Sequence, residues 1–137
     1  ISDLIGLDNL FLFGLTEAEI RARRMKGYNP RQECEQNPEL QQVIGMIENG
    51  FFAAGEAGRY QPIVNRLFQQ GDPEMVLADF AAYVQCQARV DVAYRVRRGW
   101  LARSIRTVAN MGFFVSDRAI RQYAESIWEL QPLTLPG

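Results

Sequence analysis

The chain has 137 residues and a formal net charge of −1 at pH 7, with 47% hydrophobic and 23% charged residues. This length and composition predict one globular domain with a core of its own, and the near-neutral charge argues against nucleic acid or an anionic membrane as a partner. No apolar run approaches the roughly 20 residues that cross a bilayer, and nothing at the start has the pattern of a signal peptide. Because the first residue is Ile1 rather than methionine, we expect a fragment.

The residue types exclude the most familiar catalytic and metal-binding sites. The chain contains no histidine, and its two cysteines, Cys34 and Cys86, do not form a CxxC pair. Zinc fingers, Cys-His sites and Ser-His-Asp triads therefore lack the residues that they need. We expect two reduced thiols, no metal ion and a cytoplasmic location.

The first predicted elements are a strand and a helix. Residues 7–13, LDNLFLF, form a short and nearly continuous apolar run, which is typical of a strand covered on both faces. Thr16 and Glu19 have the spacing of a capping box, so a helix begins there. We expect it to end at Gly27 in the left-handed conformation.

Five more helices are predicted after this point, following a polar connection over 27–38 that has about one helical turn. The clearest start signal is Asn37 followed by Pro38, because asparagine caps a helix and proline is tolerated in its first turn. Apolar residues at helical spacing and terminating glycines or prolines place the helices at about 37–50, 60–71, 79–95, 100–112 and 116–128.

Charged residues in these helices offer little chemistry. Lys26 is the single lysine, and its place at a helix end predicts a solvated charge rather than a Schiff base. Nothing in the spacing of Asp79, Asp91 and Glu125 pairs them as acid and base, and we expect exposed or ion-paired carboxylates. Arginines are frequent over 95–121, but the connection GFFVS is longer and more apolar than the turn of a helix-turn-helix.

Ser116, Asp117 and Arg118 begin the last predicted helix and are our candidates for structural anchors. We interpret Ser116 as the N-cap, Asp117 as a charge that favours the positive helix end, and Arg118 as the partner of a carboxylate on another element. The alternative is that Arg118 binds a ligand. The buried face of this helix is expected to consist of Ile120, Tyr123, Ala124, Ile127 and Trp128.

Four stretches of the chain, in this order and spacing, resemble the C-terminal end of the glycogen and starch (α-glucan) phosphorylases. The resemblance extends from about Asp3 to Pro132, so it covers essentially the whole chain. The four stretches are NLFLFGLTEAEIRARRMKGYNP, NPELQQVIGMIENGFF, VLADFAAYVQCQARVDVAYR and VANMGFFVSDRAIRQYAESIW.

The resemblance implies a fold of two Rossmann-like domains that face each other across a cleft, the GT-B fold of glycosyltransferases. Residues 1–131 would be the C-terminal part of the cofactor-bearing domain, mostly α-helical with one short strand near the N-terminus. Residues 132–137 would form a loose tail.

The resemblance also implies an activity, in which phosphate releases α-D-glucose 1-phosphate from an α-1,4-glucan with the aid of pyridoxal 5′-phosphate. The cofactor lysine and the glycine-rich phosphate-binding motif of that family match no residue here. We therefore assign no catalytic, cofactor-binding or metal-binding residue to this chain, and we expect it to be inactive alone. Its partners would be the remainder of the phosphorylase chain and, in the full enzyme, glucan and phosphate, with no nucleic acid and no membrane.

A free-standing helical interaction domain without a catalytic role is the competing interpretation. The predicted strand distinguishes the two, because in a phosphorylase residues 7–13 would pair with strands outside this chain. An isolated chain would then expose an unpaired apolar edge and form homo-oligomers through it.

Overall fold

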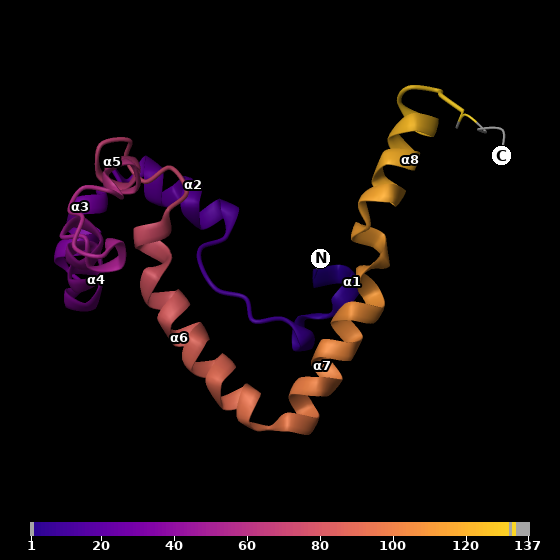
Figure 1. The fold of residues 1–137 in the computed structure, drawn as a ribbon, viewed down its shortest axis with the longest axis horizontal. Coiled ribbons are helices and arrows are strands. Elements are labelled where there is room, and N and C mark those ends of the chain that lie inside the picture. The colour runs from indigo at the N-terminus through magenta and orange to yellow at the C-terminus, as the bar shows by residue number, and fades with distance from the viewer. Residues whose placement is uncertain (1, 132, 134–137) are drawn as a thin grey trace. The chain divides into compact units, whose positions relative to one another are not determined.

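The computed structural model describes residues 2–131 and 133, and every regular element within them is helical (Figure 1). The elements are α1 (Ser2–Ile5), η1 (Leu7–Asn9), α2 (Glu17–Met25), α3 (Pro30–Glu35), α4 (Pro38–Glu48), η2 (Phe51–Ala53), α5 (Gln61–Phe68), α6 (Val76–Arg95), α7 (Arg97–Asn110), η3 (Met111–Phe114) and α8 (Ser116–Ser126), where η marks a 3-10 helix. The chain divides into two compact units, one formed by Leu12–Val90 and the other by the residues before and after it. None of the helices within the described residues has the length and apolarity needed to span a bilayer.

The predicted strand at 7–13 is wrong. Leu7–Asn9 form the 3-10 helix η1, and although Leu10 has an extended backbone (φ −121°, ψ 152°), no described residue is in a paired strand. A strand requires hydrogen bonds to a neighbouring strand, and the described residues supply none. The two-domain GT-B architecture is likewise not shown by this helical chain, and homo-oligomers formed through a strand edge lose their basis.

The start of α2 confirms the predicted capping box. The Thr16 hydroxyl accepts a hydrogen bond from the Glu19 amide, while the Glu19 carboxylate accepts one from the Thr16 amide at 2.7 Å. The Thr16 hydroxyl also donates to the Glu19 carboxylate at 2.6 Å, and this bond, followed by the one from the Thr16 amide, lowers the pKa of Glu19 because both favour its charged form. The predicted left-handed Gly27 also follows the helix, with φ at +85°.

Two asparagines position the next two helices. Asn29 caps α3, and Asn37 caps α4 through a hydrogen bond of 3.1 Å from the Leu40 amide, as its sequence predicts. Figure 1 shows α3, α4 and α5 gathered beside one another. They enclose a hydrophobic core together with the first turns of α6. Its buried members are Cys34, Leu40, Ile44, Leu67 and Leu77, with Ile47, Phe68 and Phe80 packed against them.

Asp72 joins the start of α6 to the segment between α2 and α3. Its side chain is fully buried, and one carboxylate oxygen accepts hydrogen bonds from the Tyr28 hydroxyl (2.7 Å) and the Leu77 amide (2.8 Å). The other oxygen accepts one from the Val76 amide at 2.9 Å. The carboxylate thus satisfies two of the amides that a helix leaves unpaired in its first turn. Burial, and then Asp72, raise the pKa of Tyr28 well above its usual range.

Asp79 binds backbone, whereas the sequence suggested an exposed or ion-paired carboxylate. It is half-buried, and it accepts a hydrogen bond of 2.9 Å from the Leu15 amide. The preceding residue, Gly14, has φ at +86°, and a Cβ there would lie 2.5 Å from an oxygen of Asp79. Only glycine therefore fits at this position.

The unit formed by the residues before Leu12 and after Val90 buries far fewer hydrophobic side chains. α7 packs on α1 and η1, where Phe11 stacks on Trp100 with ring centroids 6.2 Å apart and Arg103 donates to the Asp8 carbonyl at 3.0 Å. Neither α7 nor α8 has a buried residue, and Ile120 and Trp128 are 58% exposed. The predicted burial of the apolar face of α8 is therefore wrong for the described chain, because nothing in it covers that face.

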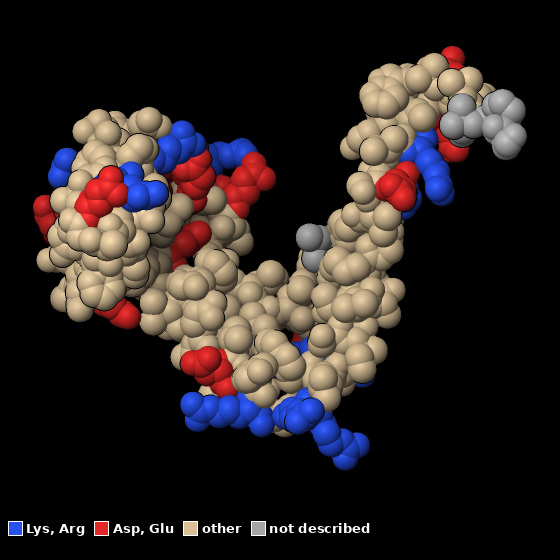
Figure 2. Space-filling view, viewed as in Figure 1, with Lys and Arg blue, Asp and Glu red and all other residues tan. Residues whose placement is uncertain are grey.

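Figure 2 shows Lys and Arg side chains gathered where α6 ends and α7 begins. The sequence places Arg95, Arg97 and Arg98 there, all of them exposed. Within the described residues none of the three forms an ion pair. The gap between the predicted helices at 79–95 and 100–112 is shorter than expected. Only Val96 separates α6 from α7, because α7 already begins at Arg97.

Replacing Asp72 with alanine will destabilise the Leu12–Val90 unit by about 3 kcal/mol, because it leaves a buried hydroxyl and two helix-start amides without their acceptor. Tyr28→Phe removes only one of these hydrogen bonds and will cost roughly 1–2 kcal/mol. The measurement is urea unfolding followed by circular dichroism. An Asp72→Ala variant no less stable than Tyr28→Phe would show that the carboxylate does not hold these elements together.

Candidate functional site

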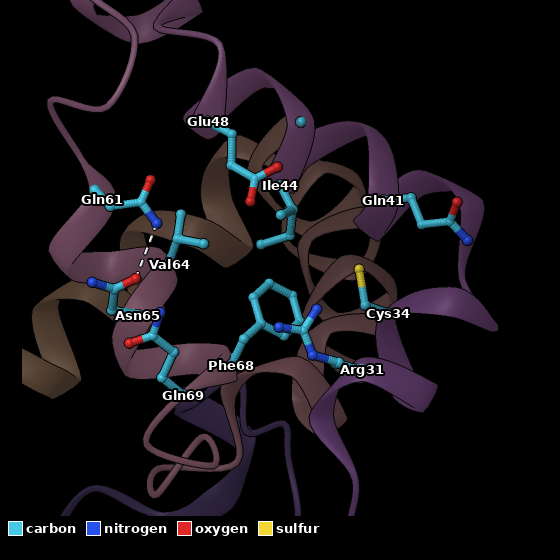
Figure 3. Close-up of a pocket in the computed structure, with 11 residues that line it drawn as sticks. Arg31, Cys34, Gln41, Ile44, Glu48, Gln61, Val64, Asn65, Phe68 and Gln69 are labelled. Carbon is cyan, nitrogen blue, oxygen red and sulfur yellow. Dashed lines mark hydrogen bonds between the residues drawn. The ribbon is translucent and has the colours of Figure 1, made fainter.

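A polar cleft of about 340 Å³ lies between α3, α4 and α5 in the Leu12–Val90 unit (Figure 3). This volume is within the range of roughly 300–1,000 Å³ that small-molecule sites occupy. Its rim carries Arg31, Gln41, Glu48, Gln61, Asn65 and Gln69. Its floor consists of Cys34, Ile44, Gly45, Val64 and Phe68.

Helical periodicity explains why these side chains meet. On α4, Gln41, Ile44 and Glu48 are separated by three and four residues, so they share one helix face. The same spacing relates Gln61, Asn65 and Phe68 on α5, and the Gln61 amide nitrogen donates to the Asn65 oxygen at 3.0 Å. The sequence analysis did not predict this cleft. The signal that could have revealed it is that α4 and α5 each carry two polar residues on the same face as an apolar one.

The charged groups of the cleft are one cation and one anion. The Arg31 guanidinium lies over the Phe68 ring, 5.2 Å from its centroid, a favourable cation–π distance. Glu48 lies on the rim, with its carboxylate directed toward the centre of the cleft in Figure 3. The described lining residues therefore carry no net charge, and the polar groups that remain are neutral amides.

Cys34 is the one thiol in this lining. It is buried, and burial raises its pKa, with further contributions from the negative charges of Glu35 and Glu48. The thiol therefore stays protonated near neutral pH and is a poor nucleophile. With no histidine in the sequence and a single carboxylate in the lining, this cleft lacks the paired acid and base that general acid–base catalysis uses.

A second, apolar cleft of about 490 Å³ lies in the same unit, between α4, α5 and the start of α6. Ile47, Ile63 and Phe80 are among its lining residues, and an ion pair between Arg66 and Glu74 stands at its edge. That ion pair lowers the pKa of Glu74 and raises that of Arg66. Apart from Glu74, which this ion pair keeps ionised, the lining contains no carboxylate, thiol or hydroxyl group.

The charged residues that the sequence analysis considered one by one do not meet in a common site. Lys26 is exposed at the end of α2 and lines none of the clefts described, and Asp91 and Glu125 are exposed on α6 and α8. Among the described residues, no three side chains of His, Cys, Asp or Glu are grouped so that they could hold a metal ion.

Ser116, Asp117 and Arg118 lie in the first turn of α8. The expected cap is absent, because Val115 occupies the N-cap position and no side chain caps the helix there. Arg118 contacts its own neighbourhood rather than a carboxylate on another element. Its guanidinium donates to the Phe113 carbonyl and, at 2.6 Å, to Gln122, and it lies 3.9 Å from the centroid of the Phe113 ring.

Comparison with known proteins identifies the chain's relatives. A sequence model of the family described as carbohydrate phosphorylase matches residues 1–130. The chain belongs to the carbohydrate phosphorylase family. It is 42% identical over 135 residues to a glycogen phosphorylase of Synechocystis sp. (strain PCC 6803), which is 98% of this chain and 16% of the relative. It is 39% identical over 137 residues to a glycogen phosphorylase of Chlamydia pneumoniae, which is 100% of this chain and 16% of the relative.

A human relative gives the same result. The chain is 43% identical over 130 residues to the brain form of human glycogen phosphorylase, which is 95% of this chain and 15% of that protein. The family membership confirms the resemblance found in the four sequence stretches. The chain spans about a sixth of the length of these members of the family.

Cys34 will react slowly with iodoacetamide at pH 8, and its rate will still increase at pH values where an ordinary thiol has reached its plateau, because its raised pKa and burial limit the thiolate. Mass spectrometry of the labelled peptide measures the rate. Glu48→Gln removes one neighbouring negative charge and will speed the reaction modestly. Alkylation of Cys34 in the folded chain as fast as in urea would contradict this account.

Proposed function

We propose that this chain is a segment of an α-glucan phosphorylase, an enzyme that uses phosphate to release α-D-glucose 1-phosphate from an α-1,4-glucan. The observation that supports this most directly is the family match over residues 1–130 together with identities of about 40% along nearly the whole chain. The segment is structural in this proposal, and the reaction takes place on residues outside it. This fits the two clefts described above, whose lining residues include no pair of groups arranged for proton transfer.

Pyridoxal 5′-phosphate is the cofactor that we propose for the whole enzyme. The residues of this chain do not fit that group. A Schiff base needs a lysine amine in a desolvated pocket, and the single lysine, Lys26, is exposed at the end of α2. The lysine that binds the cofactor must therefore lie outside these residues, and the chain alone will neither bind the cofactor nor catalyse.

Residues 1–131 would belong to the cofactor-bearing domain. The loose tail proposed for 132–137 lies, except for Leu133, outside the described residues. The partners would be the rest of the enzyme chain, glucan and phosphate. A cytoplasmic location is part of the same proposal, and the two free, buried cysteines are compatible with a reducing compartment.

We further propose that Ser116, Asp117 and Arg118 anchor the start of α8 and take no part in catalysis. Arg118 supports this directly, because its hydrogen bond to the Phe113 carbonyl and its position over the Phe113 ring tie α8 to η3. Asp117 is in the first turn, where a negative charge favours the helix.

The product of the complete gene will release glucose 1-phosphate from glycogen only when phosphate is supplied, and it will show the absorbance of bound pyridoxal phosphate. The present chain, purified alone, will show neither property. The measurement is a coupled assay for glucose 1-phosphate with and without phosphate. A complete product with no phosphate-dependent release would overturn the proposal and favour a helical interaction domain.

Arg118→Ala will lower the stability of the α8 region by about 1 kcal/mol, because it removes the cation–π contact and two hydrogen bonds. In the complete enzyme it will leave the affinity for pyridoxal phosphate unchanged. Arg121→Ala is the matched control, since Arg121 is exposed on the same helix and makes no hydrogen bond among the described residues. Thermal unfolding and cofactor titration check both expectations, and a loss of cofactor affinity in Arg118→Ala would contradict an anchoring role.

A further inference from the structure

The cleft between α3, α4 and α5 contains two charges of opposite sign that do not pair within the chain. Arg31 supplies the cation and Glu48 the anion, and both side chains line the cleft. Neither forms an ion pair with another described residue, whereas four other arginines of the chain do. Both charges are therefore available to a ligand, and a ligand that uses both must carry a charge of each sign.

The two charges lie toward opposite ends of the cleft. Glu48 is the last residue of α4, and its carbonyl accepts a hydrogen bond from the Gly58 amide, just before α5 begins at Gln61. The Arg31 guanidinium lies over Phe68, the last residue of α5, which is about 10 Å farther along that helix. The side chains of Arg31 and Glu48 both reach inward in Figure 3, so the gap that a ligand has to bridge is shorter than the helix.

This separation selects the length of the ligand. In a single α-amino acid the amino nitrogen and the carboxyl carbon are only about 2.5 Å apart, which is too short for charges at the two ends of the cleft. Two residues in an extended conformation span about 7 Å. A dipeptide with free ends is also a zwitterion at pH 7, because its amino group is protonated and its carboxyl group is ionised there.

The middle of the cleft suits the body of such a peptide. The side chains of Ile44, Val64 and Phe68 converge on an apolar floor in Figure 3, where an apolar side chain of the ligand can pack. The hydrogen bond from Gln61 to Asn65 leaves the Gln61 oxygen and the Asn65 nitrogen without a protein partner in the described chain. A peptide group, which has one N–H and one C=O, matches this acceptor and this donor.

We propose that this cleft binds a dipeptide with an apolar side chain, its amino group at Glu48 and its carboxylate at Arg31. The planar guanidinium of Arg31 can bind the carboxylate through two parallel hydrogen bonds. Because Phe68 lies at the Arg31 end, the apolar side chain belongs to the second residue of the peptide. The proposal does not depend on the phosphorylase function, since it follows from the charges and the lining of the cleft alone.

The first experiment varies the ligand and leaves the protein unchanged. Isothermal titration calorimetry at pH 7 on the product of the complete gene, with alanyl-leucine as the probe, will show saturable binding of one peptide per chain. N-acetyl-alanyl-leucine lacks the positive end and alanyl-leucine amide lacks the negative end, so each will bind at least fivefold more weakly. Leucine alone will also bind at least fivefold more weakly, because its two charges are too close together.

The second experiment assigns each charge of the peptide to a residue. Glu48→Gln will weaken binding of alanyl-leucine at least fivefold but leave the affinity for the N-acetyl peptide unchanged, since that peptide has no cation to lose. Arg31→Gln will do the same with respect to the peptide amide. Glu39→Gln and Arg121→Gln are the matched controls, because both residues are exposed and neither lines the cleft, and both variants will bind as the unchanged protein does.

Three results would overturn the proposal. They are the absence of saturable binding of alanyl-leucine, capped peptides or leucine that bind as tightly as the free dipeptide, and cleft variants that lose no more affinity than the controls. Circular dichroism establishes that each variant is folded. If a cleft variant misfolds, the comparison of free and capped peptides on the unchanged protein still decides whether both charges are recognised.

Discussion

The buried carboxylate of Asp72 is the contact on which the Leu12–Val90 unit depends. It joins the Tyr28 hydroxyl, which follows α2, to the first amides of α6, so residues 44 positions apart in the sequence are held at hydrogen-bonding distance. The chain between Tyr28 and Asp72 forms α3, α4 and α5. The hydrogen bond between these two residues therefore fixes the beginning and the end of the segment that supplies most of the core. Because a buried carboxylate without donors is strongly unfavourable, the three hydrogen bonds and the local fold require each other.

The two units differ in how much of their apolar surface they bury. Leu12–Val90 enclose a core that includes Leu40, Ile44 and Leu67, whereas Ile105 on α7 and Ile127 just after α8 are more than 60% exposed. Apolar stripes of this kind need a covering surface. In the phosphorylase that we propose, other residues of the enzyme would cover these stripes.

Local signals carried the sequence predictions that proved correct. The capping box at Thr16 and the Asn37-Pro38 start depend on neighbours within one helical turn, so they can be recognised without the fold. The strand at 7–13 failed because pairing depends on a second segment that local sequence does not specify. The roles of Asp72 and Asp79 were missed for the same reason, since the Tyr28 hydroxyl that binds Asp72 and the Leu15 amide that binds Asp79 are brought close only by tertiary packing. The polar cleft arises from the packing of α4 on α5, which periodicity alone does not reveal.

Amide hydrogen exchange at Leu77 tests most directly whether Asp72 holds this unit together. Leu77 is buried and its amide donates to the Asp72 carboxylate at 2.8 Å. If that bond forms part of the cooperative fold, its amide will exchange only through unfolding of the whole unit, as slowly as core amides in α4. Exchange at Leu77 as fast as in an exposed loop would contradict the account, because the start of α6 would then open independently of the core.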